Sequence, residues 1–209
     1  MPDKTHPPLC LFGAGGHGKV VASFARSLWQ APLCFADNSH DIGTRVSGLL
    51  VEFQSIEDIR DHSLIVTIGV NKVRETLQNR AQDYGLEIAT LVSDQAIYMT
   101  DIRPGLGTLV FGGGIVNADA KLGKGVIINS NAVVEHDCQI GDFCHIAPGA
   151  VALGGCMLGD RVWLGANATV LQNVTIASDC IISAGAVVTS DISQPGVYAG
   201  NPAQHQKFR

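Results

Sequence analysis

Three consecutive residues, Glu135, His136 and Asp137, have the types and spacing best suited to acid–base chemistry. The imidazole of histidine has an unperturbed pKa of about 6.5, so it can take up and release a proton near neutral pH. A carboxylate beside the ring orients it and stabilises its protonated form. We therefore predict that His136 is a general base oriented by Asp137, with Glu135 as the alternative orienting acid. A solvated histidine at a turn is the competing interpretation.

A glycine-rich run near the start of the chain is the second candidate. Gly13, Gly15 and Gly18 fit the pattern G-x-G-x-x-G, and Asp37 follows further along the chain. Such glycines let the backbone approach a phosphate at a helix N-terminus, and an acid after the second strand can bind a ribose hydroxyl. Residues 1–91 make up only about half of a full dinucleotide-binding fold, so we expect a mononucleotide or nucleotide-sugar site rather than a redox cofactor. A purely structural turn is the alternative.

The elements that must position this run alternate between strands and helices. Apolar segments at residues 9–12, 33–36 and 64–68 predict buried strands, and helices are expected at about 19–29 and 71–83. Because parallel strands are joined through crossover helices, this order predicts a Rossmann-like α/β domain with a parallel sheet.

From residue 92 onward the sequence repeats with a period of six. Steps of six from Val92 to Val188 give seventeen positions, of which fourteen are Val, Leu or Ile, and a mostly small residue follows four places after each. A strand alternates with period two and a helix with period 3.6, so neither alone produces this pattern. A coil of three short, flat walls, with one hexapeptide in each wall and three walls in each triangular turn, does produce a period of six. Residues 92–209 are therefore predicted to form an all-β left-handed parallel β-helix with a C-terminal tail, with polar residues and glycines at its corners.

The repeat also accounts for most of the cysteines. Cys138, Cys144, Cys156 and Cys180 all fall on the small interior position, where a free cysteine packs as a small hydrophobic residue. The other two, Cys10 and Cys34, lie in predicted strands and are expected to pack there. Neither group predicts a disulfide framework.

The hexapeptide pattern resembles the bacterial transferase hexapeptide family, most of whose members are acyltransferases. Together with the opening Gly-Ala-Gly-Gly-His-Gly, it resembles the group of sialic acid O-acetyltransferases and nucleotide-amino-sugar N-acetyltransferases of the bacillosamine and perosamine type. The segment Gly69-Val70-Asn71-Lys72-Val73-Arg74 is similar to a Gly-x-Asn-x-x-Arg stretch of this group. The resemblance implies acetyl-CoA as co-substrate, no metal, and a homotrimer with active sites between subunits.

For the reaction, the resemblance favours N-acetylation of a nucleotide-linked 4-amino-4,6-dideoxy sugar for glycan biosynthesis. His136 would act as general base in a direct attack on the thioester. The alternative is O-acetylation of sialic acid or a related sugar. Several nucleotide-sugar members have two adjacent acids where this chain has Asp37 and Asn38, which leaves the nucleotide base open.

The same resemblance assigns residues to both substrates. At the nucleotide sugar it implies Gly13, Gly15, Gly16, His17, Asp37, Asn38 and Gly69. At the coenzyme it implies His145, Gly154, Gly165, Ala166, Ala184 and Gly185. His145 would approach the acetyl group or the pantetheine arm and donate a hydrogen bond to the thioester oxygen. A histidine at the surface or at an interface is the other interpretation of His145.

Composition and charge narrow the remaining classes of function. The net charge is −5, only 16% of residues are charged, and no cluster of Lys and Arg occurs, which disfavours nucleic acid and anionic membranes as partners. The N-terminus is polar and rich in proline rather than a signal peptide, and no apolar run reaches the ~18 residues of a membrane span, so we expect a cytoplasmic protein.

Two other functions of β-helices fit less well. Zinc-dependent β-helix enzymes hold the metal through three histidines, whereas this repeat contains only His136 and His145. Scaffold and ice-binding helices need a flat, regular face of threonine or similar residues, and the outward positions here are irregular.

Overall fold

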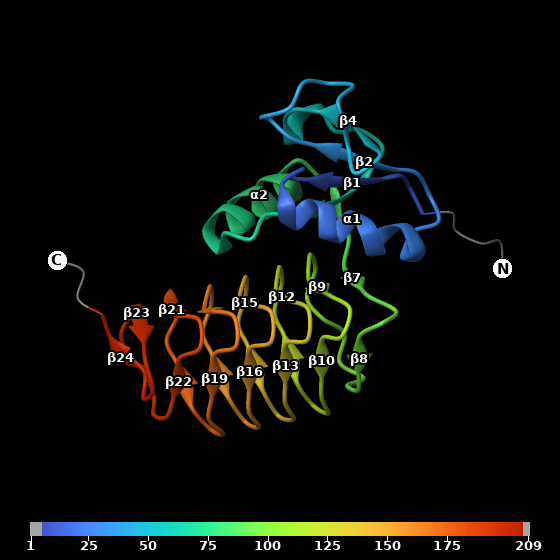
Figure 1. The fold of residues 1–209 in the computed structure, drawn as a ribbon. Coiled ribbons are helices and arrows are strands. Elements are labelled where there is room, and N and C mark those ends of the chain that lie inside the picture. Colours follow the sequence, from blue (N-terminus) through green and yellow to red (C-terminus); the bar gives the residue numbers. More distant parts are fainter. Residues whose placement is uncertain (1–5, 207–209) are drawn as a thin grey trace. The chain divides into compact units, whose positions relative to one another are not determined.

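The computed structural model describes residues 6–206 of the chain, which divide into two compact units, Met1–Leu91 and Val92–Arg209 (Figure 1). The polar segment that argued against a signal peptide begins in residues 1–5, which lie outside the described part. Within residues 6–206, no helix is both long and apolar enough to cross a membrane.

The N-terminal unit is built around one mainly parallel sheet, in the order β3-β4-β2-β1-β5-β6. Its elements are β1 Leu9–Phe12, α1 Gly16–Leu28, β2 Leu33–Ala36, β3 Arg45–Val46, β4 Leu49–Phe53, the 3-10 helix Ile56–Asp58, β5 Ser63–Val66, α2 Asn71–Asp83 and β6 Glu87–Ile88. Among the described strands of this unit, only β3 and β4 pair antiparallel. Helix α2 contributes Ala81 to the apolar cluster on the sheet face that carries Cys10, Cys34 and Leu64.

The predicted parallel α/β sheet is confirmed, with local differences at its ends and edges. Helix α1 begins at Gly16 rather than near Lys19, because the extended residue Gly15 is its N-cap and the glycines after it are already helical. Strands β3, β4 and β6 were not predicted. Two of them have only two residues, too few for the alternation of polar and apolar side chains that marks a strand in sequence.

The C-terminal unit is a left-handed parallel β-helix with three walls, as the period of six predicted. The six-stranded wall contains β8 Ile97–Tyr98, β10 Ile115–Val116, β13 Val133–Val134, β16 Val151–Ala152, β19 Thr169–Val170 and β22 Val187–Val188. The four-stranded wall contains β11 Lys121–Leu122, β14 Gln139–Ile140, β17 Met157–Leu158 and β20 Thr175–Ile176. The eight-stranded wall contains β7 Leu91–Val92, β9 Leu109–Val110, β12 Ile127–Ile128, β15 His145–Ile146, β18 Trp163–Leu164, β21 Cys180–Ile182, β23 Gly196–Ala199 and β24 Gln204–His205.

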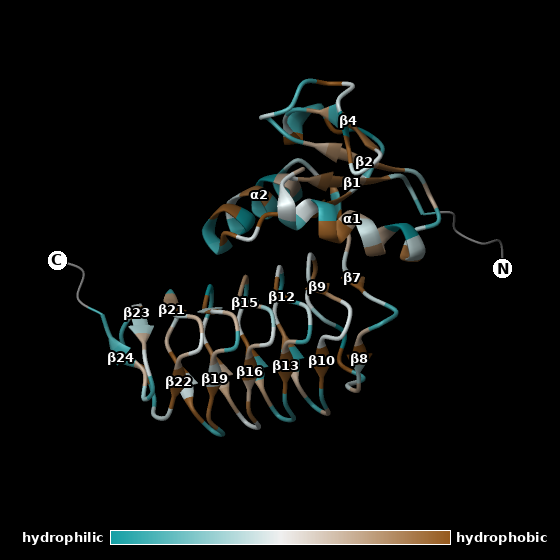
Figure 2. Ribbon diagram, viewed as in Figure 1, coloured by the Kyte–Doolittle hydropathy of each residue, from teal (hydrophilic) through white to brown (hydrophobic). Residues whose placement is uncertain are grey.

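Each wall stacks residues that are 18 apart in the sequence. Val116 pairs with Val134, which pairs in turn with Ala152. In the two-residue strands from β9 to β22 the second residue points inward, and these residues belong to a single apolar cluster that also includes the four interior cysteines. Figure 2 shows hydrophobic colour on strands such as β10 and β13 and hydrophilic residues in several of the connecting turns. The interior is therefore filled by side chains and is not a channel.

The corners of the β-helix use the left-handed backbone conformation with the same period of six. One residue per hexapeptide, from Gly107 to Gly185, has a φ between 55° and 78°. Most of these residues are Gly, Asn or Asp, which adopt this conformation at low cost. Phe143 and Arg161 are the exceptions. Arg161 donates two hydrogen bonds of 2.9 Å to the carboxylate of Asp179 in the next coil, which helps to offset the backbone cost.

Candidate active site

The turn between β13 and β14 carries the predicted acid–base group. Asp137 has a φ of 60°, and its Oδ2 accepts a hydrogen bond from Nδ1 of His136 at 2.8 Å. Glu135 instead accepts a hydrogen bond of 3.3 Å from the backbone N–H of His136. Because Nδ1 donates its proton to Asp137, the neutral ring has its lone pair on Nε2. The side chain of His136 is 62% exposed, so Nε2 is accessible to a ligand.

The charge around His136 favours the protonated ring. The hydrogen bond with Asp137 raises the pKa of His136 above the ordinary histidine value, partial desolvation opposes this, and the charges of Asp137 and Glu135 add to the rise. The ring therefore stays protonated to a higher pH than an ordinary histidine, and its neutral form is the one that can act as a general base.

Glycine forms the floor beneath the imidazole. A Cβ atom on Gly154, in the next coil, would lie 2.6 Å from Nε2 and from Cε1 of His136. No larger residue fits there while the ring keeps its position. The ring and this floor belong to an open pocket of about 450 Å³ lined by Glu135, His136, Asp137, Leu153, Gly154, Gly155, Gln172 and Asn173.

The polar residues Gln172 and Asn173 were not predicted from the sequence. Asn173 lies 36 residues after Asp137, two coils further along, and its backbone N–H donates to the carbonyl of Gly154 at 3.0 Å. The signal that could have found it is the 18-residue spacing of the coils, which stacks Asp137, Gly155 and Asn173 at one corner.

In the N-terminal unit, the glycines at and after the end of β1 have two different structural roles: two permit close packing, and two leave the backbone exposed. A Cβ on Gly18 would lie 1.9 Å from the carbonyl oxygen of Gly13, and a Cβ on Gly13 would lie 2.9 Å from Ile68. These two glycines permit close packing. Around Gly15 and Gly16 a Cβ would meet nothing within 4 Å. The backbone there, at the N-terminus of α1, is open to a ligand.

Asp37, at the end of β2, is bonded to this loop. Its Oδ2 accepts the N–H of Ala14 at 2.7 Å, and its Oδ1 accepts bonds from the backbone and hydroxyl of Ser39 and from the ring of His40. Burial opposes ionisation, but the hydrogen bonds from His40, Ala14 and Ser39 outweigh it and lower the pKa of this carboxyl. Asp37 therefore holds the loop in place, while Asn38 beside it is exposed.

The loop after β5 completes this edge of the sheet. Thr67 donates to the carbonyl of Gly13 at 2.7 Å, and the buried Arg74 donates to the carbonyls of Ile68 and Gly69. Burial, and then the charge of Arg74, lower the pKa of His17 to about 4. The first turn of α1 therefore presents a neutral imidazole at physiological pH. The described loops after β1, β2 and β5 thus meet at the carboxyl ends of three parallel strands, where α/β sheets bind ligands.

The residues predicted at the coenzyme fall into two separate clusters. Gly165 and Ala166 precede β19, Ala184 and Gly185 precede β22, and these two turns stack through the N–H of Gly185 and the carbonyl of Ala166 at 2.8 Å. Gly154 instead follows β16 in the same six-stranded wall. The two clusters therefore lie at opposite ends of the strands of this wall and do not meet within one chain.

His145 belongs to neither cluster. It lies on β15 in the eight-stranded wall, is 7% exposed, and stacks parallel to Trp163 with ring centroids 5.7 Å apart. Its Nε2 lies 3.0 Å from Nδ2 of Asn129, which can only donate, so the neutral ring carries its proton on Nδ1. Within one chain, the four-stranded wall separates His145 from the pocket at His136, so its predicted role at the acetyl group stays a prediction.

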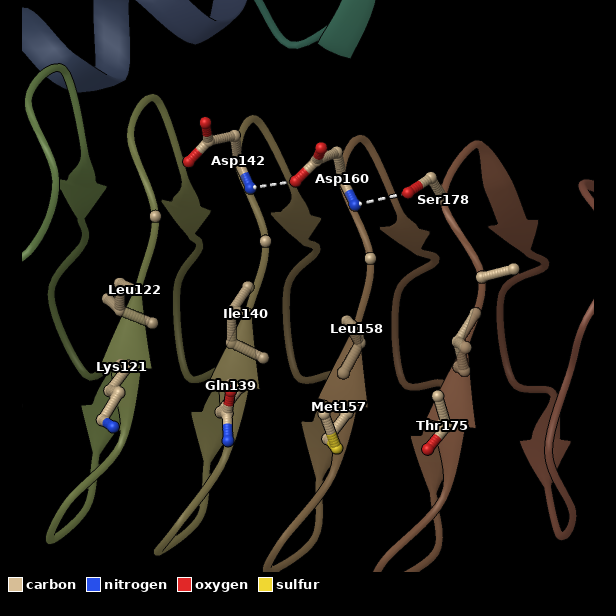
Figure 3. A pocket seen from close by; sticks show the side chains of 15 residues that line it. Lys121, Leu122, Gln139, Ile140, Asp142, Met157, Leu158, Asp160, Thr175 and Ser178 are labelled. Carbon is tan, nitrogen blue, oxygen red and sulfur yellow. Dashed lines mark hydrogen bonds between the residues drawn. The ribbon is translucent and has the colours of Figure 1, made fainter.

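A groove of about 660 Å³ lies along the four-stranded wall (Figure 3). A ladder of hydrogen bonds runs along its rim. Asp142, Asp160 and Ser178 each accept, through a side-chain oxygen, the backbone N–H of the residue 18 places earlier. These oxygens already stabilise the coils. The groove has no histidine or cysteine in its lining, so the candidate base lies only at the neighbouring turn, in the smaller pocket.

Comparisons with known proteins agree with this geometry. Residues 8–81 match the family described as PglD N-terminal domain, and residues 119–154 and 155–190 match the bacterial transferase hexapeptide family. The acetyltransferase domain of PglB from Neisseria gonorrhoeae, solved with acetyl coenzyme A, is 32% identical with a TM-score of 0.90, over 96% of this chain and 100% of that one. This chain belongs to the hexapeptide-repeat sugar acetyltransferases with a PglD-type N-terminal domain.

Two other solved structures are similar over both units. PerB from Caulobacter crescentus, solved with CoA and GDP-perosamine, is 32% identical with a TM-score of 0.88, over 96% of this chain and 97% of that one. WeeI from Acinetobacter baumannii is 27% identical with a TM-score of 0.88, over 95% and 99%. A comparison with curated protein sequences gave no match. The expected group of acetyltransferases is therefore confirmed, whereas the acceptor and the individual site residues stay predictions.

Proposed function

We propose that this acetyltransferase transfers the acetyl group of acetyl-CoA to the amino group of a nucleotide-linked 4-amino-4,6-dideoxy sugar, and that it works in the cytoplasm. The observation that carries the proposal is the accessible His136 ring, bonded to Asp137 above a glycine floor, in a chain that also holds an open glycine-rich loop. Support for the two substrates comes from PglB, solved with acetyl coenzyme A, and PerB, solved with CoA and GDP-perosamine.

His136 acts as the general base in a direct transfer. The sugar amine attacks the thioester carbonyl while Nε2 of His136 takes up its proton, and the negative oxygen that forms collapses to release CoA as the thiolate. The protonated ring then returns the proton to the sulfur. Asp137 stabilises the imidazolium through the bond to Nδ1, and Glu135 adds negative charge nearby.

The N-terminal unit, residues 1–91, binds the nucleotide sugar, and residues 92–209 carry out the transfer. Open backbone at Gly15 and Gly16 suits the close approach of a diphosphate to the N-terminus of α1. The neutral ring of His17 can donate or accept one hydrogen bond without adding charge. Asn38 and Gly69 lie on the adjacent loops and are the remaining predicted contacts.

We propose a homotrimer, and the outer face of the six-stranded wall supports this proposal. The first residue of each strand in this wall points outward, and five of the six are Ile or Val. The outward row is Ile97, Ile115, Val133, Val151, Thr169 and Val187. Ile97 is 50% exposed and the others are half-buried in the single chain. A continuous apolar row of this kind is suited to burial against further copies of the chain.

This packing would also unite the two separated clusters. Three copies that turn their six-stranded walls toward a common axis bring the turns at one end of these strands close to the turns at the other end in the next copy. His136 and Gly154 of one subunit would then meet Gly165, Ala166 and Ala184 of a neighbour. The coenzyme would lie in the seam between them.

The acceptor is tested by CoA release from acetyl-CoA, followed through its free thiol, with a panel of nucleotide-linked 4-amino-4,6-dideoxy sugars and with free sialic acid. We expect rapid turnover of at least one nucleotide sugar and none of sialic acid. The matching nucleotide sugar with a hydroxyl in place of the 4-amine is the control and should be inert. Turnover of sialic acid alone would contradict the proposal and favour an O-acetyltransferase.

The pH dependence tests the role of Asp137. Because the pKa of His136 is raised, the ring stays protonated to a higher pH, and kcat/KM should rise with pH through a midpoint above the ordinary histidine value. Asp137→Asn removes the charge but keeps a residue that tolerates a φ of 60°, so the midpoint should move to lower pH and the maximal rate should fall by about tenfold or more.

Glu135→Gln is the matched control for this measurement, since Glu135 bonds to the backbone and not to the ring. The midpoint of the rise of kcat/KM with pH should move less in Glu135→Gln than in Asp137→Asn. If this midpoint is unchanged in Asp137→Asn, or moves equally in both variants, the assignment of Asp137 as the orienting acid would be contradicted.

A further inference from the structure

A cluster of metal-ligand side chains lies in the N-terminal unit, apart from every residue assigned to the reaction. The thiol of Cys34, a carboxylate oxygen of Glu52 and a ring nitrogen of His62 all lie within 4.8 Å of one another. Among the described residues, this is the only group of three or more His, Cys, Asp and Glu side chains so arranged. The three residues come from β2, from β4 and from the position directly before β5, so they are far apart in sequence and meet only through the fold.

The ring of His62 is held in the manner of a metal ligand. Its Nδ1 lies against the backbone carbonyl of Arg60, which can only accept, so Nδ1 carries the proton and Nε2 keeps its lone pair. Metal-binding histidines usually donate their second ring N–H to a carbonyl or carboxylate in this way. The ring of Phe53 packs edge-on against His62 at 5.2 Å and restricts its rotation.

Cys34 and Glu52 supply the remaining donors. Cys34 is buried, and Cys10 lies beside it in register on β1. The Cys34 thiol is the sulfur donor that lies within 4.8 Å of both the Glu52 carboxylate and the His62 ring. Glu52 is the unpaired extra residue at the irregularity in the pairing of β2 with β4, and its exposed side chain leaves the cluster open to solvent.

We propose that Cys34, Glu52 and His62 bind a divalent metal ion, with Zn²⁺ as the preferred ion, and that this ion stabilises the N-terminal unit. A thiolate, an imidazole and a carboxylate together form a donor set typical of zinc, which accepts all three in tetrahedral geometry. Water completes the fourth position. A bound metal ion would link β2, β4 and the start of β5. Asp37 follows the other end of β2, and Thr67 follows the other end of β5.

The test uses the full chain, with any affinity tag removed and its thiols reduced. After equilibrium dialysis against Zn²⁺ and then against metal-free buffer, the protein should retain about one Zn²⁺ per chain and melt at a higher temperature than the chelator-treated protein. With Co²⁺ in place of Zn²⁺, the near-ultraviolet absorption of a cobalt–thiolate bond should appear. Retention below about half an equivalent, or Co²⁺ binding without this absorption, would overturn the proposal.

Variants separate this site from adventitious binding. Glu52→Gln and His62→Gln should lose the retained metal, Cys34→Ser should lose the cobalt–thiolate absorption, and the control Glu75→Gln should keep both. Glu52 is exposed, so Glu52→Gln has the least effect on folding and remains informative if Cys34→Ser does not fold. Unchanged metal retention in both Glu52→Gln and His62→Gln would overturn the proposal.

Discussion

Replacing His136 with alanine is expected to lower kcat for acetyl transfer by about 10²- to 10⁴-fold, the usual contribution of a positioned general base. The imidazole is 62% exposed at a turn and is not part of the apolar interior, so its removal should leave the fold intact. Because the ring takes the proton only as the amine attacks, the KM for acetyl-CoA should change much less than kcat.

The measurement is steady-state kinetics with both substrates varied, together with the circular dichroism spectrum and the oligomeric state of the variant. His6→Ala serves as the control, since the ring of His6 packs at a tilt against Trp29 in the N-terminal unit and has no assigned role. A kcat for His136→Ala within about threefold of the unmodified enzyme, with the fold unchanged, would exclude His136 as the base.

Gly154→Ala should reduce activity by about 10²-fold without a comparable loss of stability, because a misplacement of about 1 Å in a catalytic group can cost that much. The added Cβ would lie 2.6 Å from Nε2 and Cε1 of His136, too close for the ring to remain where it is. The exposed ring can rotate away from the methyl group, but its bond to Asp137 would then be lost. We expect kcat to fall while the melting temperature changes little.

The matched control for this variant is Gly112→Ala. Gly112 occupies the same position seven hexapeptides earlier, and a Cβ there would meet first the end of the flexible Gln95 side chain, at 3.1 Å. The two substitutions therefore add the same atom at equivalent corners, and only one of them touches the imidazole. Equal activity in the two variants would contradict the role of Gly154 as the floor of the site.

Much of the fold was predictable because the same residue pattern recurs many times along the sequence. Almost every hexapeptide places one aliphatic residue in a narrow interior, so the register of the β-helix could be fixed from Val92 to Val188 without structural information. The acid–base group was predictable for a different reason, since Glu135, His136 and Asp137 are adjacent in sequence. Local patterns of this kind can be recognised from the sequence alone.

Contacts through space were harder to predict. The stacking of Gly154 beneath His136 follows from the 18-residue coil, whereas the bonds from Ala14, Ser39 and His40 to Asp37 depend on how two loops meet. The cluster of Cys34, Glu52 and His62 is the extreme case. Its members are 18 and 10 residues apart with no motif between them, so Cys34 was expected only to pack in a strand and no site was predicted at Glu52 or His62.

The central claim, transfer of acetyl to a sugar amine, is tested most directly by the bond formed in the product. The enzyme would be incubated with acetyl-CoA labelled with ¹³C at the acetyl carbonyl and with a nucleotide-linked 4-amino-4,6-dideoxy sugar, and the product examined by NMR. The account predicts that the label appears in an amide on the 4-nitrogen and resists mild alkali. Label in an alkali-labile ester, or no label in the sugar while acetyl-CoA is consumed, would contradict it.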